Sequence, residues 1–540
     1  PAEVKIPTDK SITDLFDEAA KKNPEFVSMI FYGKEYKRKD FKDKVDRLAT
    51  AFQQKLGIKK GDKIAIYLLN GPDFLIAYMA GLKAGATMTC ISPLFVPREV
   101  AYQIKDSESQ TLVTIDIFYP RITADEVKND INLKNIVLTN LFGQTPNVPE
   151  SKEKGIYHME NLIQNTPPNV TKVKIDPVKD IAVIQYTGGT TGLPKGALLT
   201  HYNLIANAHQ VKAPTEAQMK RFKEDTIKAI SLLPWYHIYG QTCEIVTAQM
   251  LDSTAVVFAD PRNAEMVLDT INKFKPWQIL AVSTMLIQLM NHPKAKETDF
   301  TCVKYMNMGA ASTPDEVAKQ WKKVSGWPLS EGYGLTEASP VTHTRQAVLF
   351  GEKLGSIGPP IPNTLAGIVD SETNKFLPIG EMGELVISGP QVMQGYWKKP
   401  EETKKVFFEA GGYKWLKTGD LAKMDKDGYF YIVDRTKDII KYKGHSVYPR
   451  EIEEVLFEHP AVLEAAVIGI PDPEAGENIK AFIVLKPDYK DKITEEEMKN
   501  WLKERVAAYK YPRYIEFIEA LPKTNVGKVL RRVLREQDAA

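Results

Sequence analysis

Residues 186–196 read YTGGTTGLPKG, a stretch that contains four glycines, three threonines and one lysine. Glycine lets the backbone turn its N–H groups toward one point, and the threonine hydroxyls add further donors. Lys195 adds a positive charge, and this combination favours a polyphosphate over a neutral ligand. The spacing does not match the G-x-x-x-x-G-K-[ST] phosphate loop, so the stretch alone leaves a glycine-rich surface turn open as an alternative.

The sequence on either side of this loop predicts two strands and a helix. DIAVIQYT (180–187) and GALLT (196–200) are apolar runs of strand length, and a helix is expected from about His201 with Thr200 as its N-cap. The loop therefore joins two strands and does not begin a helix. Its own N–H groups, its hydroxyls and Lys195 must bind the ligand.

Short apolar runs alternate with amphipathic segments over most of the chain, a pattern that is typical of α/β layers. KIAIYLLN (63–70) and LVTIDIF (112–118) are predicted to be buried strands, with a helix over 72–86 between them. The sequence therefore predicts an α/β fold.

The composition changes after about residue 380, where short segments rich in β-forming residues follow one another. The last hundred residues predict a small α+β unit. We place the boundary in the charged segment DRTKD (434–438). This gives a large N-terminal domain over 1–434, with several subdomains of α/β layers and a β-rich portion, and a small C-terminal domain over 435–540.

The overall composition excludes several classes of protein. The 540 residues are 43% hydrophobic and 26% charged, so large cores can form, and the net charge of +2 does not indicate nucleic acid as a partner. Cys90, Cys243 and Cys302 are too far apart to indicate a disulfide framework or a zinc cluster. No apolar run approaches the roughly 18 residues that cross a bilayer, and the N-terminal PAEVKIPTDK lacks the apolar core of a signal peptide. We therefore expect a cytoplasmic protein without a transmembrane segment.

Two further stretches contain aromatic residues beside groups that can bind ligands. LPWYHIYG (233–240) places Trp235 near His237, although such a cluster taken alone predicts core packing. GYGLTE (332–337) places a tyrosine between glycines, where its face is free for stacking, and Glu337 is a hard oxygen ligand suited to Mg²⁺. A turn with an exposed acid is the alternative for the second stretch.

Two more stretches carry charged groups near the C-terminal end. KTGD (417–420) offers Asp420, whose carboxylate can accept hydrogen bonds from two ribose hydroxyls. LPKTNVGKVLRR (521–532) places Lys528 directly after a glycine. A solvated basic tail is the alternative for this last stretch.

The order of these stretches is more specific than any one of them. From about residue 10 to residue 535 the chain resembles the adenylate-forming superfamily of acyl-CoA synthetases, luciferases and peptide-synthetase adenylation domains. The stretches in register are YTGGTTGLPKG, LPWYHIYG, GYGLTE, KTGD, DRTKDIIKYKGHSVYPREIE (434–453) and LPKTNVGK. The resemblance implies that a carboxylate attacks the α-phosphate of ATP, which gives an acyl-adenylate and pyrophosphate. The thiol of coenzyme A then displaces AMP.

The resemblance also implies roles for individual residues. Tyr333 should stack on adenine, Thr336 should contact the α-phosphate, and Asp420 and Arg435 should hold the ribose. Glu337 should bind Mg²⁺. The full set of ATP-binding residues implied is Thr187, Gly188, Gly189, Thr190, Thr191, Gly192, Lys195, Gly332, Tyr333, Gly334, Thr336, Asp420, Arg435 and Lys528. The acyl pocket implied consists of Trp235, His237, Gly309, Ala310 and Ala311.

In relatives of this kind the small C-terminal domain is mobile and rotates after adenylation. Lys437 lies at the implied hinge, and Lys528 is the implied catalytic lysine of the first step. Lys441, Lys443 and Gly444 belong to a loop that is implied to enter the site for the coenzyme A step, with Lys441 then facing the adenylate. His237 is implied to flank the adenylate and to guide the thiol. Two positions depart from the common pattern, since Gly188 and Val526 stand where serine or threonine is frequent.

The leading hypothesis is an acid:CoA ligase that acts on a fatty acid or another simple carboxylic acid. An aryl-acid or 4-coumarate-type CoA ligase and a luciferase-like enzyme use the same machinery and stay open. An amino-acid-activating domain is disfavoured because LPWYHIYG lacks the aspartate expected for a substrate amino group. A non-catalytic nucleotide-binding regulator should lack Lys528 or Glu337, and both are present. Relatives are often dimers, so a homodimer is the oligomeric state to test, and the sequence leaves the acyl chain length open.

Overall fold

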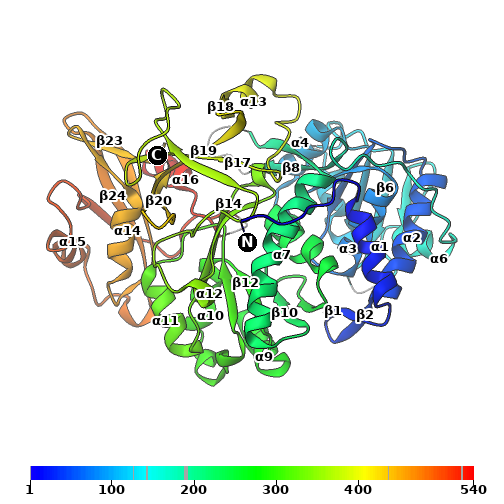
Figure 1. Cartoon of the computed structure of the whole chain (residues 1–540), viewed down its shortest axis with the longest axis horizontal. Coiled ribbons are helices and arrows are strands. Elements are labelled where there is room, and N and C mark those ends of the chain that lie inside the picture. The colour runs from blue at the N-terminus through cyan, green and yellow to red at the C-terminus, as the bar shows by residue number, and fades with distance from the viewer. Residues whose placement is uncertain are drawn as a thin grey trace.

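The computed structural model describes residues 2–125, 127–141, 144–187, 193–435, 437–524 and 527–539. The first 345 residues contain two large sheets (Figure 1). The eight-stranded sheet has the order β15 (Val341–Arg345), β14 (Ser330–Gly334), β13 (Tyr305–Met308), β12 (Gln278–Ala281), β10 (Ile227–Ser231), β11 (Ser253–Val257), β1 (Val27–Phe31) and β2 (Lys34–Lys37). The seven-stranded sheet has the order β7 (Ile156–His158), β6 (Asn135–Thr139), β5 (Thr111–Ile115), β3 (Lys63–Tyr67), β4 (Thr87–Cys90), β8 (Ile181–Thr187) and β9 (Lys195–Thr200).

Most neighbouring strands in both large sheets are parallel, as the α/β pattern predicts. The helices that connect or cover them are α1 (Ile12–Lys22), α2 (Arg38–Gln54), α3 (Pro72–Lys83), α4 (Pro97–Ser107), α5 (Tyr119–Thr123), α6 (Met159–Gln164), α7 (His201–Phe222), α8 (Ile238–Gly240), α9 (Ala264–Phe274), α10 (Ser283–Asn291), α11 (Asp315–Ser325) and α12 (Ala347–Phe350). No helix within the described ranges is both long and apolar enough to cross a membrane.

Two smaller sheets follow. The first contains β16 (Leu365–Val369), β17 (Met382–Ser388), β18 (Phe407–Ala410), β19 (Tyr413–Met424) and β20 (Phe430–Arg435), with α13 (Pro400–Val406) beside it. The second contains β21 (Ile440–Tyr442), β22 (His445–Val447), β23 (Val462–Asp472), β24 (Gly476–Leu485) and β25 (Tyr514–Phe517), with α14 (Pro449–Phe457), α15 (Glu495–Lys503) and α16 (Arg531–Asp538). This last unit has its own apolar core, which includes Ile440, Ile452, Val467, Ile479 and Met498.

Local sequence signals place the elements around the glycine loop correctly. The glycine loop joins β8 to β9, and α7 begins at His201 with the Thr200 hydroxyl accepting a hydrogen bond from Asn203 N at 3.1 Å. The strand predicted over 112–118 is too long, because β5 ends at Ile115 and a 3₁₀ helix follows over Asp116–Phe118. The Asp116 carboxylate accepts a hydrogen bond from Ile117 N at 2.8 Å, which is a local bond that competes with strand pairing.

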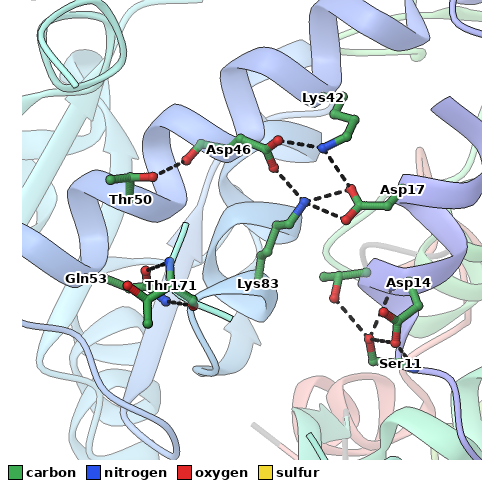
Figure 2. A network of polar contacts seen from close by, with 10 residues as sticks. Ser11, Asp14, Asp17, Lys42, Asp46, Thr50, Gln53, Lys83 and Thr171 are labelled. Carbon is green, nitrogen blue, oxygen red and sulfur yellow. Dashed lines mark hydrogen bonds and ion pairs between the residues drawn. The ribbon is translucent and has the colours of Figure 1, made fainter. Parts of the chain in front are cut away.

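A ring of charged side chains ties α1, α2 and α3 together (Figure 2). Lys83 Nζ lies 2.7 Å from Asp17 Oδ1 and 2.5 Å from Asp46 Oδ1, and Lys42 Nζ lies 2.5 Å from Asp46 Oδ2. The lysine on α3 therefore binds carboxylates on both other helices. These three helices form the end of the molecule opposite the C-terminal unit in Figure 1.

Candidate active site

One cavity of about 1490 Å³ brings most of the predicted site residues together. It is lined by Thr187, Lys195, Trp235, His237, Gly309, Ala310, Ala311, Gly332, Tyr333, Gly334, Thr336, Glu337, Asp420, Arg435, Lys437 and Lys528. These residues come from both large sheets, from the β16–β20 sheet and from the C-terminal unit. Gly188, Gly189, Thr190, Thr191 and Gly192 lie outside the described residues, as does Val526.

The residues predicted for the coenzyme A step lie elsewhere. Lys441, Lys443 and Gly444 are exposed on the β21–β22 hairpin, and Lys441 Nζ donates to Ser446 Oγ at 2.8 Å. Gly444 has a φ of +81° and Lys443 a φ of +46°, which form the tight turn of this hairpin. The hairpin does not line the cavity in the described arrangement of the chain.

Asp420 connects three elements at one side of the cavity. Tyr333 Oη donates to Asp420 Oδ2 at 2.5 Å, and Arg435 Nε lies 3.4 Å from Asp420 Oδ1. Asp420 on β19 and Arg435 on β20 are direct partners in the sheet register, so strand pairing holds them side by side. Burial, followed by the Asp420 charge, raises the pKa of Tyr333 well above its ordinary value, so the phenol keeps its proton and donates.

Lys195 and Glu337 are both linked to Tyr396, a residue that the sequence analysis did not single out. Tyr396 Oη donates to Glu337 Oε1 at 2.7 Å, and Lys195 Nζ lies 5.3 Å from the centre of the Tyr396 ring. Tyr396 belongs to the triplet GYW (395–397). Its glycine–tyrosine pair is the same kind of signal that drew attention to GYGLTE.

Lys195 also forms an ion pair that the sequence did not predict. Its Nζ lies 2.6 Å from Glu402 Oε2 on α13, and both side chains are about one-third exposed. Lys405 lies 2.7 Å from the other oxygen of Glu402. The hydrogen bond from Lys195, followed by that from Lys405, lowers the pKa of Glu402 to about 2, so this carboxylate is an anion at neutral pH.

Lys528 lines the cavity, and contacts between residues 523–524 and 528–529 hold it there. Lys523 and Val529 pair as a β-bridge, and Thr524 N donates to Lys528 O at 2.7 Å while Lys528 N donates to Thr524 Oγ1 at 3.1 Å. Burial, followed by the Arg435 charge, lowers the pKa of Lys528 to about 7. This ammonium therefore lies in surroundings that favour an anion beside it.

His237 is neutral at neutral pH. Burial, followed by the Lys528 charge, lowers the pKa of His237 to about 4. Its Nδ1 accepts a hydrogen bond from Tyr239 N at 3.2 Å. A neutral ring with an accepting Nδ1 carries its proton on Nε2, so His237 offers an N–H donor.

Apolar side chains also line the same cavity. Trp235 lines it, and the indole Nε1 donates to Glu244 Oε2 at 2.9 Å. Burial raises the pKa of Glu244 to about 8, so the carboxyl is mostly neutral at pH 7. The apolar part of its lining includes Phe16, Ala20, Met29, Phe41, Leu75, Ala229, Ala248 and Ala255. Phe16, Phe41 and Leu75 lie on α1, α2 and α3, the three helices that the charged ring ties together.

The described residues contain no group of three or more His, Cys, Asp or Glu side chains that could hold a metal ion. Mg²⁺ in nucleotide sites is commonly held by one or two carboxylates together with substrate phosphates. A single carboxylate such as Glu337 therefore fits a magnesium ion that arrives with a nucleotide, not a resident metal centre.

Comparison with known proteins identifies the family of the chain. The sequence profile of the family described as AMP-binding enzyme matches residues 16–397, and that of the AMP-binding enzyme C-terminal domain matches residues 451–528. The long-chain-fatty-acid–CoA ligase of Bacillus subtilis (strain 168) is 38% identical over 555 residues, which covers 100% of this chain and 96% of that protein.

Two solved structures are similar over nearly their whole lengths. The anthranilate CoA ligase AuaEII in complex with anthranoyl-AMP has a TM-score of 0.86 at 25% identity and covers 99% of this chain and 98% of that one. ATP-bound MatB from Rhodopseudomonas palustris has a TM-score of 0.85 at 25% identity, with 98% and 99% covered. Apo MatB, at the same identity and coverage, has a TM-score of 0.74. The profile and the relatives together show that the chain belongs to the AMP-binding enzyme family.

Proposed function

We infer that this chain is an AMP-forming acid:CoA ligase that acts on long-chain fatty acids. The observation that carries this inference is the cavity, whose lining includes Tyr333 and Lys528 as well as the apolar side chains of Phe16 and Phe41. Pockets for drug-sized ligands measure about 300–1,000 Å³, and this cavity of about 1490 Å³ is larger. It has room for a nucleotide and a long acid together. The name of the Bacillus subtilis relative supports the same substrate class.

In the proposed first step, a carboxylate oxygen of the acid bonds to the α-phosphorus of ATP, and the bond to the bridging oxygen breaks to release pyrophosphate. Both reactants are anions, so positive charge around the phosphates lowers the barrier. Lys528 and Arg435 would supply such charge, while Asp420 would accept hydrogen bonds from the ribose. Glu337 is the residue that would hold Mg²⁺, which when bound would neutralise phosphate charge.

In the proposed second step, the thiol sulfur of coenzyme A bonds to the carbonyl carbon of the acyl-adenylate and loses its proton to water. The bond from that carbon to the phosphate oxygen breaks, and AMP leaves. His237 would donate its Nε2 proton in a hydrogen bond to an oxygen of the adenylate. The neutral state of His237 supports this role over that of a cation.

We further propose that the chain divides near Lys437 into domains 1–434 and 435–540, and that the second domain rotates between the two steps. The separate core of the C-terminal unit supports this division. The position of Lys528 at the cavity supports an arrangement suited to the first step, as does the higher similarity to ATP-bound than to apo MatB. After rotation, Lys441, Lys443 and Gly444 would replace Lys528 at the site.

The test is pyrophosphate release from ATP with acetate, octanoate, palmitate or a cinnamate, each with and without coenzyme A. We expect palmitate to give the highest kcat/KM, and acyl-CoA to form only when coenzyme A is present. A cinnamate that outperforms palmitate would instead assign the chain to the aryl-acid ligases. Free amino acids are tested in the same way, because pyrophosphate release with them would indicate an amino-acid-activating domain.

A further inference from the structure

Tyr396 lies between two backbone segments that each carry a proposed ATP-site residue. Trp397 N donates to Gly196 O at 2.7 Å, which fixes the GYW triplet beside β9. On the other side, Met393 N donates to Glu337 O at 2.8 Å. Tyr396 also donates its own N–H to Thr403 Oγ1 at 2.9 Å. The tyrosine backbone is therefore held in place relative to both segments.

The side chain of Tyr396 connects these two segments a second time. Its hydroxyl donates to Glu337 Oε1 at 2.7 Å, and its ring lies 5.3 Å from Lys195 Nζ. An ammonium at this distance from an aromatic face is attracted by the ring quadrupole. One residue thus contacts both the loop lysine and the acid that would hold Mg²⁺.

The hydrogen bond uses one of the two carboxylate oxygens of Glu337. Within the described part of the chain, Tyr396 Oη is the one hydrogen-bond partner of this carboxylate. The bond restricts rotation of the carboxylate about its last torsion and leaves Oε2 to accept another ligand. Outer groups that orient a metal-binding side chain in this way typically change metal affinity by about 10- to 100-fold.

Building on the proposed function, we propose that Tyr396 is a positioning residue that orients Glu337 for the magnesium ion arriving with ATP. Without the hydroxyl, the Glu337 carboxylate must be ordered when the ion binds. Removal of the hydroxyl should therefore reduce the factor by which Mg²⁺ lowers the Kd of ATP. It should not change the Kd of ATP in the absence of Mg²⁺. The ring of Phe at this position would still lie beside Lys195.

The experiment is isothermal titration of the full chain with ATP, in EDTA and at a series of Mg²⁺ concentrations, without acid or coenzyme A. For Tyr396→Phe we expect the Kd of ATP in EDTA to be unchanged, and the tightening by Mg²⁺ to be smaller by roughly tenfold. The matched control is Tyr431→Phe, which removes a tyrosine hydroxyl that donates to Asp425 Oδ2 at 3.1 Å. The control should respond to Mg²⁺ as the wild type does.

A double-mutant cycle with Glu337→Gln separates a positioning role from a general loss of structure. In the Glu337→Gln background, Tyr396→Phe should change the Mg²⁺ response no further. The proposal would be overturned if Mg²⁺ lowered the Kd of ATP by the same factor in Tyr396→Phe and in the wild type. It would also be overturned if Tyr396→Phe reduced this factor further in the Glu337→Gln background. The measurement needs no acid substrate, so it stands even if the chain fails to activate fatty acids.

Discussion

Gly527 packs directly against Thr284. A Cβ built on Gly527 would lie 2.4 Å from Thr284 Oγ1 and 3.4 Å from Val282 Cγ2. Gly527 precedes Lys528 in the C-terminal unit, whereas Thr284 lies on α10 beside the eight-stranded sheet. The close approach of these two residues is therefore part of what seats Lys528 at the cavity.

Gly527→Ala should slow adenylation because the methyl group pushes the turn away from Thr284. Gly527 also has a φ of +74°, which costs an L-residue roughly 1–2 kcal/mol. Gly428→Ala is the matched control, since its φ is +79° and a Cβ there meets nothing within 4 Å. We expect adenylation by Gly527→Ala to be roughly tenfold slower than by the control, which corresponds to about 1.4 kcal/mol. Equal rates for the two variants would show that the contact does not matter.

Sequence reasoning succeeded where the signal is local. Thr200 caps α7 through a residue three positions away, and the glycine loop joins two strands that are adjacent in the chain. The pair Lys195–Glu402 joins residues 207 positions apart, and neither charge differs in sequence context from many surface charges. Likewise, the placement of Phe16 and Phe41 in the lining of the cavity depends on how α1 and α2 pack. No local pattern encodes such contacts.

Glu402→Gln should tighten the binding of free ATP. In the described structure Glu402 neutralises Lys195, so an incoming phosphate must replace that carboxylate. Solvent-accessible ion pairs contribute about 0.2–1 kcal/mol, and we therefore expect the Kd of ATP in EDTA to fall by up to about fivefold. Glu401→Gln on the same helix is the control with the same change of net charge, because Glu401 pairs with Lys404 instead. If both variants bind ATP alike, Glu402 does not compete with the nucleotide.

ATP binding should take up protons at pH 8. The pKa of Lys528 is about 7 without ligand, so the side chain is mostly neutral at pH 8. Phosphate anions beside it favour the ammonium and raise its pKa, hence binding adds a proton and ATP affinity falls as the pH rises from 6 to 8. Titration calorimetry in two buffers of different ionisation enthalpy counts the protons. Lys528→Arg stays charged throughout and should remove this uptake, whereas equal uptake by both proteins would contradict the assignment.

Lys83→Met should destabilise the N-terminal region. Lys83 is 14% exposed and lies between Asp17 and Asp46, so its loss leaves carboxylates without their central cation. Removing one partner of such a partly buried group costs about 1–3 kcal/mol, which should lower the first thermal transition by several degrees. Lys179→Met is the control, since Lys179 is 83% exposed and lies 3.8 Å from Asp176. The first transition temperature of Lys83→Met should be clearly lower than that of Lys179→Met. Equal transition temperatures would mean that the charged ring of Figure 2 contributes little to stability.

Lys437→Pro should uncouple the two half-reactions. Proline fixes its own φ near −65° and restricts the residue before it, so a hinge at this position loses the freedom to rotate. Pyrophosphate release with palmitate should continue, while conversion of a supplied palmitoyl-adenylate to palmitoyl-CoA should fall by at least about tenfold, the effect of roughly 1.4 kcal/mol on the barrier. Lys426→Pro is the control, because Lys426 follows Asp425 in a turn closed by Gly428 N donating to Asp425 O at 3.0 Å, a position that proline favours. Both substitutions remove one lysine charge and one N–H. If only Lys437→Pro fails to form the thioester, the defect therefore comes from the loss of rotation at residue 437. Normal turnover by Lys437→Pro would place the hinge elsewhere.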